Sequence, residues 1–194
     1  MARVVVEGPC VYLPDRLCAG PRVVGGNTAS ALPECKFTYV DKSGSRITQD
    51  RFDAARDFSE GLAPVQVGKQ WGFIDRSGAI VVSPQFEDAE PFASGLSRTR
   101  DHQRFAYVDQ SGAIRIGPQF QYAESFHEGF AVVGDQNLYW YIDQSGLRQG
   151  WGVFAAASPF FKGLAHVKLT PSDALKSGAA FAYIDTTGAR VFTY

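Results

Sequence analysis

The sequence predicts an all-β protein built from tandem repeats, because three features recur along it with a period of 34 residues. An aspartate is followed three places later by a glycine, two aromatic residues precede that aspartate, and a Phe-x-x-Gly segment precedes the aromatic pair. Self-similarity at a fixed period indicates one small supersecondary unit used several times. The aspartates are Asp41, Asp75, Asp109, Asp143 and, after a longer gap, Asp185.

The stretch from Trp71 to Val82 predicts a β-hairpin. Its two halves are rich in aromatic and β-branched residues, and Asp75-Arg76-Ser77-Gly78 separates them. The aspartate accepts hydrogen bonds from N–H groups of a turn, and the glycine supplies the positive φ that a type I turn with a following bulge requires. We expect the same hairpin at each of the five aspartates.

Two further segments complete the expected unit. Gly61–Val65 predicts a strand that leads into the aromatic one. The return segment Pro84–Phe92 is too irregular for a strand, so we expect an arch or a single helical turn held by its two phenylalanines. Each phenylalanine contributes about 1.5–3 kcal/mol when fully buried, which is reason enough for its recurrence. The unit is then a three-stranded meander that must stack on its neighbours to bury its apolar face.

We expect a single repeat domain over residues 1–194. Aligning Gly20 with Gly61 places Val4–Val6 close to the phase of the strand at Ile80–Val82, which suggests a degenerate unit at the start of the chain. The expected segments are a degenerate half-unit plus loop at 1–35, four repeats at 36–168, an inserted loop at 169–180 and a half-unit at 181–194. The insertions Gly25–Cys35 and Leu169–Ala180 are rich in Gly, Ala, Ser and Pro, which is typical of loops.

The repeats predict an open, solenoid-like stack of meanders. The alternative is a closed, propeller-like ring of five units, whose chain ends would complete one another. Ring closure requires the Val4–Val6 strand to pair beside the strand at Arg190–Tyr194.

The second unit has the most complete motif. It contains Trp71-Gly72-Phe73-Ile74-Asp75, then Ser77-Gly78, a short aliphatic strand, Pro84-x-Phe86 and Phe92-x-x-Gly95-Leu96. This pattern resembles the bacterial WG-repeat family, and the resemblance covers about residues 36–194. It implies a binding or interaction module without indicating what is bound. In the other units the Trp-Gly pair has drifted, and the literal Trp151-Gly152 lies in a different phase of the repeat.

Composition argues against several classes of function. The formal net charge is −1, and no basic stripe of the kind that binds nucleic acid is present. The sequence contains no apolar run long enough to cross a membrane and no secretory h-region at its start, so we expect a cytoplasmic protein without nucleic-acid or membrane partners. Three widely spaced cysteines, Cys10, Cys18 and Cys35, fit reduced thiols. We expect no metal and no cofactor, because the three histidines occupy different phases of the repeat.

The recurring aspartates are the most tempting catalytic residues, since pairs of carboxylates hydrolyse glycosides. However, a catalytic pair needs two different environments, whereas these aspartates share one local sequence. We therefore expect each aspartate to cap its own turn and predict no enzymatic activity.

Two tryptophans break the repeat rule within one unit. Trp140 replaces a small residue and Trp151 replaces Ser83, on the two strands of one expected hairpin. They either compensate each other in packing or form an exposed aromatic patch that contacts a partner. The leading functional hypothesis is a non-enzymatic scaffold that binds a protein, as an inhibitor or antitoxin-like protein does. The alternative is a carbohydrate or cell-wall binding module that uses the exposed aromatics.

Overall fold

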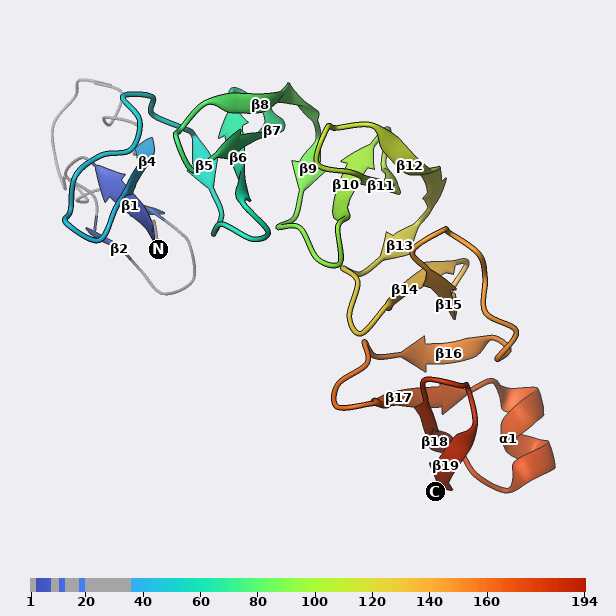
Figure 1. The fold of residues 1–194 in the computed structure, drawn as a ribbon. Helices are drawn as coiled ribbons and strands as arrows, with labels where there is room; N and C mark the ends of the chain where they lie inside the picture. Colours follow the sequence, from blue (N-terminus) through green and yellow to red (C-terminus); the bar gives the residue numbers. More distant parts are fainter. Residues whose placement is uncertain (1–2, 8–10, 13–17, 20–35) are drawn as a thin grey trace, which may run out of the picture. The chain divides into compact units, whose positions relative to one another are not determined.

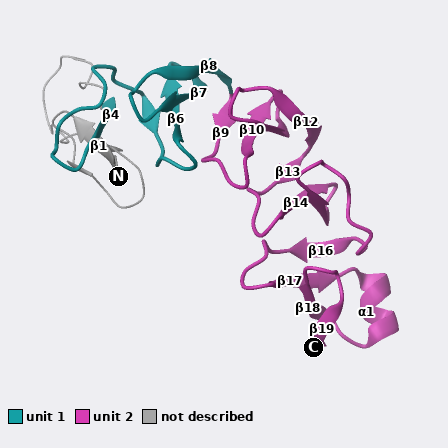
Figure 2. Cartoon of the chain, viewed as in Figure 1, with its two compact units in different colours: residues 1–86 teal, residues 87–194 magenta. Residues whose placement is uncertain are grey.

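The computed structural model describes residues 3–7, 11–12, 18–19 and 36–194 (Figure 1). The chain divides into two compact units, Met1–Phe86 and Glu87–Tyr194, which are coloured separately in Figure 2. Described residues are almost entirely β, in antiparallel sheets of which none closes into a barrel. The predicted all-β repeat architecture is therefore confirmed.

The described residues of the first unit form three sheets. Its strands are β1 (Arg3–Glu7), β2 (Val11–Tyr12), β3 (Cys18–Ala19), β4 (Lys36–Val40), β5 (Ala54–Ala55), β6 (Leu62–Val67), β7 (Gln70–Asp75) and β8 (Ile80–Phe86). β1 pairs with β4, β2 pairs with β3, and the third sheet has the order β5-β6-β7-β8.

The second unit contains two sheets and one helix. Its elements are β9 (Asp88–Ala89), β10 (Ser97–Asp101), β11 (Arg104–Val108), β12 (Ile114–Phe120), β13 (Tyr122–Ala123), β14 (Phe130–Asp135), β15 (Leu138–Asp143), β16 (Phe154–Ala157), β17 (Leu164–Leu169), α1 (Pro171–Ser177), β18 (Phe181–Asp185) and β19 (Arg190–Thr193). The sheet orders are β12-β11-β10-β9 and β13-β14-β15-β16-β17-β18-β19. β16 pairs with both β15 and β17, so it joins two consecutive repeats into one sheet.

The predicted Asp-x-Ser-Gly turns are present at all five aspartates. At Asp75, one carboxylate oxygen accepts hydrogen bonds from the Ser77 N–H, the Ser77 hydroxyl and the Ala79 N–H, at 2.8, 2.6 and 3.1 Å. Gly78 has a φ of 87°, as the turn requires. The same three bonds recur at the other aspartates, with Thr187 in place of serine at Asp185.

The glycine of the Phe-x-x-Gly segment forms a second tight turn. Glu60 and Gly61 both have positive φ, 50° and 94°, and Ser59 and Leu62 exchange backbone hydrogen bonds across them. Two successive residues with positive φ are typical of a two-residue type I′ hairpin loop. The same pair of angles recurs at Ser94–Gly95, Glu128–Gly129 and Lys162–Gly163. Glycine recurs there because of this positive φ and not for lack of space, since nothing lies within 4 Å of a Cβ built on these glycines.

The return segment differs from the prediction. Residues up to Phe86 continue the strand β8, and Asp88–Ala89 forms the short strand β9, so Pro84–Phe92 holds neither an arch nor a helical turn. Shifts of register between β7 and β8 absorb its irregularity as β-bulges. Each complete repeat is therefore four-stranded, with a short leading strand, rather than a three-stranded meander.

The N-terminal strand takes a different position from the expected one. β1 pairs with β4 in the register Val4↔Tyr39, which matches the register Pro64↔Phe73 of β6 with β7. β1 therefore occupies the place of the Gly-Leu strand and not that of Ile80–Val82. β1 and β4 form a two-stranded sheet, and β19 is the last strand of the seven-stranded sheet. The insertion Gly25–Cys35 and two cysteines, Cys10 and Cys35, lie outside the described residues, as does the Cys18 side chain.

The second insertion, expected to be a loop, contains the helix α1. The Thr170 hydroxyl accepts a hydrogen bond from the Asp173 N–H, Pro171 begins the helix, and Gly178 ends it with a φ of 70°. These three residues are the ordinary start and stop signals of a helix. Among the described residues, no helix is long and apolar enough to cross a membrane.

Candidate functional site

Each repeat junction inside the two units is built around a buried tyrosine. The rings of Tyr39, Tyr107 and Tyr141 are at most 1% exposed, and each is covered by a phenylalanine from the following repeat. The centroid distances are 5.0 Å for Tyr39–Phe58, 4.9 Å for Tyr107–Phe126 and 5.1 Å for Tyr141–Phe160. The next repeat thus completes the core of the one before it.

The tyrosine hydroxyl also finds its hydrogen-bond acceptor in the following repeat. It donates a hydrogen bond to a backbone carbonyl two residues before the covering phenylalanine, at 2.7 Å to Arg56, 2.7 Å to Glu124 and 2.8 Å to Ser158. Burial raises the pKa of all three tyrosines, so the hydroxyls stay protonated and act as donors. A buried hydroxyl without a partner costs about 1–3 kcal/mol, which makes the carbonyl part of the junction.

At the C-terminal end of the repeats the equivalent face is uncovered. Tyr183 occupies the tyrosine position but is 37% exposed. Phe192 pairs with it across the sheet, as Ile116 pairs with Tyr107, yet Phe192 is 58% exposed and Ile116 only 4%. We use the name C-terminal face for the side chains on this side of β17, β18 and the last residues of the chain, namely Leu164, His166, Phe181, Tyr183, Phe192 and Tyr194.

The C-terminal face is a continuous group of rings. His166 stacks on Phe181 at 5.4 Å with an interplanar angle of 11°, and Tyr194 stacks on Phe181 at 5.6 Å. The Tyr194 hydroxyl lies 2.9 Å from Nε2 of His166, which fixes the two rings relative to each other. Tyr183 and Phe192 both contact the Tyr194 ring, at 6.4 and 5.7 Å. The face is thus held in place by its own contacts although it is open to solvent.

The two sequence-predicted contact residues, Trp140 and Trp151, lie in different core clusters and are both half-buried. Trp140 packs edge-on against Phe120 at 6.3 Å, with the Arg148 guanidinium over its ring. Trp151 contacts the rings of Phe130, Tyr141 and Phe160. They do not form the shared patch that their places on one hairpin suggested.

Both tryptophans have a packing explanation. A Cβ on Gly72, the equivalent of Trp140, would lie 2.4 Å from the Val82 carbonyl oxygen, because the bulged strand β8 passes close by. In the repeat that contains Trp140, the strand that follows the turn, β16, begins only at Phe154, which leaves room for the Trp140 indole. Trp151 packs against the turn of the next repeat, and its Cδ1 would lie 2.0 Å from a Cβ built on Gly188. At the preceding junction, Ile116 packs against Gly146 in the same way.

The five aspartates do not converge on a shared site. Each carboxylate is held by its own turn, and the hydrogen bond from the serine or threonine hydroxyl at the second following position is the main cause that lowers its pKa. For Asp109 the pKa falls to about 2, with the Arg115 guanidinium contributing through a 2.7 Å hydrogen bond. These carboxylates are ionised turn caps, which is the structural role that the sequence predicts.

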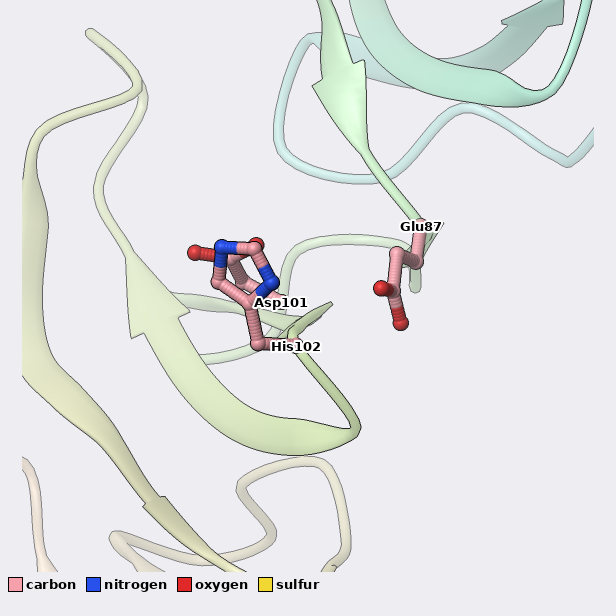
Figure 3. A group of neighbouring side chains, drawn as sticks. All are labelled: Glu87, Asp101 and His102. Atoms are coloured by element: carbon pink, nitrogen blue, oxygen red, sulfur yellow. The ribbon is translucent and has the colours of Figure 1, made fainter.

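Glu87, Asp101 and His102 form a group of metal-type ligands, with donor atoms within 4.8 Å of one another (Figure 3). The Glu87 carboxylate is already engaged, because it accepts from the Gln103 N–H at 3.4 Å and lies 3.5 Å from Arg100. The equivalent residues one repeat before and after Glu87 make the same kind of contact. Asp53 accepts a hydrogen bond from the Gly68 N–H, and Gln121 accepts one from the Gln136 N–H. The grouping is therefore explained by a contact that the repeat makes for structural reasons.

A small open pocket of about 240 Å³ lies beside β13 and β15. It is lined by Gln121, Tyr122, Gly134, Asp135, Gln136, Asn137 and Tyr139. The Tyr122 and Tyr139 rings meet edge to face at 5.1 Å, and Oδ1 of Asp135 is buried without a hydrogen-bond partner. Burial is the main cause that raises the pKa of Tyr122, to about 12, and its hydroxyl donates to Glu124.

Sequence reasoning missed the C-terminal face, although a signal for it is present. Tyr183 aligns with Tyr39, Tyr107 and Tyr141, so the periodicity alone indicates a residue whose burial depends on a following repeat. A second sequence signal is Phe192, since phenylalanine replaces the smaller Val82 and Ile116 at this position.

Comparison with known proteins gives a family but no function. The model of the WG containing repeat matches residues 37–71, 71–101 and 105–139. The chain is similar to a crystal structure of a Bacteroides caccae protein of unknown function, with 14% identity over 81% of this chain and 74% of that one and a TM-score of 0.34.

It is also similar to a crystal structure described as the eukaryotic initiation factor, with 12% identity over 82% of this chain and a TM-score of 0.50. The chain spans 49% of that protein, and the likeness concerns the fold alone. No curated protein gives a significant match. Three tandem matches over more than half of its length show that this chain belongs to the WG-repeat family.

Proposed function

We propose that the protein is a non-enzymatic scaffold that binds a protein partner through its C-terminal face. The observation that supports this most directly is the exposure of Tyr183 and Phe192, because the equivalent side chains Tyr107 and Ile116 are buried in their own repeat. Exposed aromatics on a rigid sheet are enriched at protein interfaces, because they bury much apolar area and lose little conformational entropy. β19 additionally ends its sheet, so a partner can add a strand to it.

An affinity-capture experiment tests this proposal. The intact chain is expected to retain one stoichiometric protein, and the variant Tyr183→Ser/Phe192→Ser/Tyr194→Ser is expected to lose it. A matched control, Leu147→Ser/Phe161→Ser/Leu175→Ser, changes three apolar residues that are 66–87% exposed and lie outside the C-terminal face. Equal capture by both variants, each shown to be folded by circular dichroism, would refute binding through this face.

The second candidate function is carbohydrate binding, now at the pocket that Tyr122 and Tyr139 help to line. Aromatic rings beside amide and carboxylate groups suit a sugar. Glycan binding predicts a change in protein fluorescence on addition of a polysaccharide, and Tyr139→Ala is expected to abolish it. A flat response across a broad glycan panel would remove this candidate.

A further inference from the structure

One aromatic position of the repeat is covered by a cation at three of its occurrences. From the second hairpin on, the residues at this position are Trp71, Phe105, Tyr139 and Phe181. The covering pairs are Arg56 over Trp71 at 4.4 Å, Arg98 over Phe105 at 4.9 Å and Lys168 over Phe181 at 6.0 Å. A cation within about 6 Å of a ring centroid is attracted by the negative face of the ring. The repeat therefore tends to hold a positive charge over this ring.

Tyr139 is the exception among these four rings, because no cationic group of the described residues lies over it. The three positions that supply the cations elsewhere are occupied in its repeat by Glu124, Val132 and Gly134. A carboxylate thus replaces one cation, and glycine leaves no side chain in place of another. The open pocket of about 240 Å³ lies at this place, and both Gly134 and Tyr139 line it.

We infer that this pocket binds a guanidinium group, carried by an arginine side chain of a polypeptide or by free arginine, with its plane over the Tyr139 ring. The bound group then takes the place that the chain's own Arg98 takes over Phe105. This inference goes beyond the proposed function, because it concerns the pocket and not the C-terminal face. It also assigns the pocket a different ligand from the sugar of the second candidate function.

The groups around the pocket suit a guanidinium. Asp135 lines the pocket with a side chain that is 37% exposed, and the Arg104 guanidinium already lies 3.5 Å from its carboxylate. Glu124 accepts a hydrogen bond from the Tyr122 hydroxyl, so a second carboxylate lies beside the pair of rings that Tyr122 and Tyr139 form at 5.1 Å. A guanidinium is planar, stacks on aromatic rings and donates to carboxylates, and it therefore uses both kinds of group at once.

The test titrates the intact chain, labelled with ¹⁵N, with N-acetyl-arginine amide. Concentrations up to about 20 mM are needed, because a single cation–π contact gives weak binding. The amide signals of Gly134 and Tyr139 are expected to shift. N-acetyl-citrulline amide has nearly the same shape without the charge, and it is expected to leave these signals in place. Free arginine forms the second arm, and tighter binding than that of the capped compound would identify the free amino acid as the source of the guanidinium.

Variants of the chain separate the ring from the charge. Tyr139→Leu is expected to weaken binding about 2–30-fold, the range of one cation–π contact. The matched control Phe105→Leu removes the equivalent ring one repeat earlier, which Arg98 already covers, and should bind normally. Glu124→Arg places a cation of the chain at the position of Arg56 and is expected to abolish the shifts. The amide spectrum of each variant shows whether it is folded.

Several results would overturn the inference. They are equal shifts with the arginine and citrulline compounds, no shift at about 20 mM, and unchanged binding by Tyr139→Leu. A polysaccharide that shifts the same signals where the arginine compounds do not would assign the pocket to a sugar instead. The proposed function is judged separately, since affinity capture depends on variants of the C-terminal face and not on Tyr139.

Discussion

Tyr141 and Tyr183 occupy the same position in consecutive repeats, yet one is 1% exposed and the other 37%. Both lie in the seven-stranded sheet and both precede an Asp-x-Ser/Thr-Gly turn. The difference arises outside the repeat, because Tyr141 is covered by Phe160 and bonded to the Ser158 carbonyl of the next repeat. The burial of the tyrosine at this position therefore depends on groups that lie outside its own repeat, as expected where each repeat contacts its neighbours.

The largest expected effect is at the covered tyrosine. Phe160→Ala removes the ring that packs against Tyr141, and it should destabilise the protein by about 3–5 kcal/mol, as for other buried phenylalanines. Phe192→Ala removes a ring of the same size at the uncovered junction and should change stability by less than about 1 kcal/mol. Urea unfolding followed by circular dichroism gives both values. Similar losses of stability for the two variants would mean that the Phe192 ring packs as closely as the Phe160 ring.

Much of this architecture could be predicted from the sequence, since the period, the hairpins and the turn role of Asp75 all follow from local chemistry. The course of Pro84–Phe92 could not, because its irregularity is absorbed by bulges that depend on the partner strand β7. The place of β1 was also missed, since an aliphatic run such as Val4–Val6 fits more than one strand of the unit. The roles of Trp140 and Trp151 depend on which face of the sheet each side chain enters, and hairpin spacing alone does not determine that.

The turn glycines show the same contrast between a covered and an uncovered position, with a smaller effect. Gly188→Ala adds a Cβ that would lie 2.0 Å from Trp151, at a φ of 82°. We expect a loss of about 2–4 kcal/mol, since the steric conflict adds to the cost of positive φ in alanine. Gly44 has nearly the same φ, 86°, with nothing within 4 Å of its missing Cβ, so Gly44→Ala should cost only the conformational part, about 1–2 kcal/mol. Thermal unfolding of the pair measures the difference, and equal melting temperatures would contradict a packed turn at Gly188.

The aspartate turns should show almost no contrast, because their bonds lie within one hairpin. Asp109→Asn and Asp185→Asn keep the shape of the cap and remove its charge, so each should lower the melting temperature slightly, and by a similar amount.

The pH dependence separates this charge from general loss of stability. Because the serine and threonine hydroxyls lower the folded-state pKa of these carboxylates from 3.8, the ionised cap stabilises the fold above pH 4. That contribution is lost as the pH falls toward about 2, the folded pKa of Asp109. Melting temperatures between pH 2 and 5 should therefore fall less steeply for Asp109→Asn than for the unmodified chain. An unchanged slope would show that the carboxylate is no better stabilised in the folded turn than in the unfolded chain.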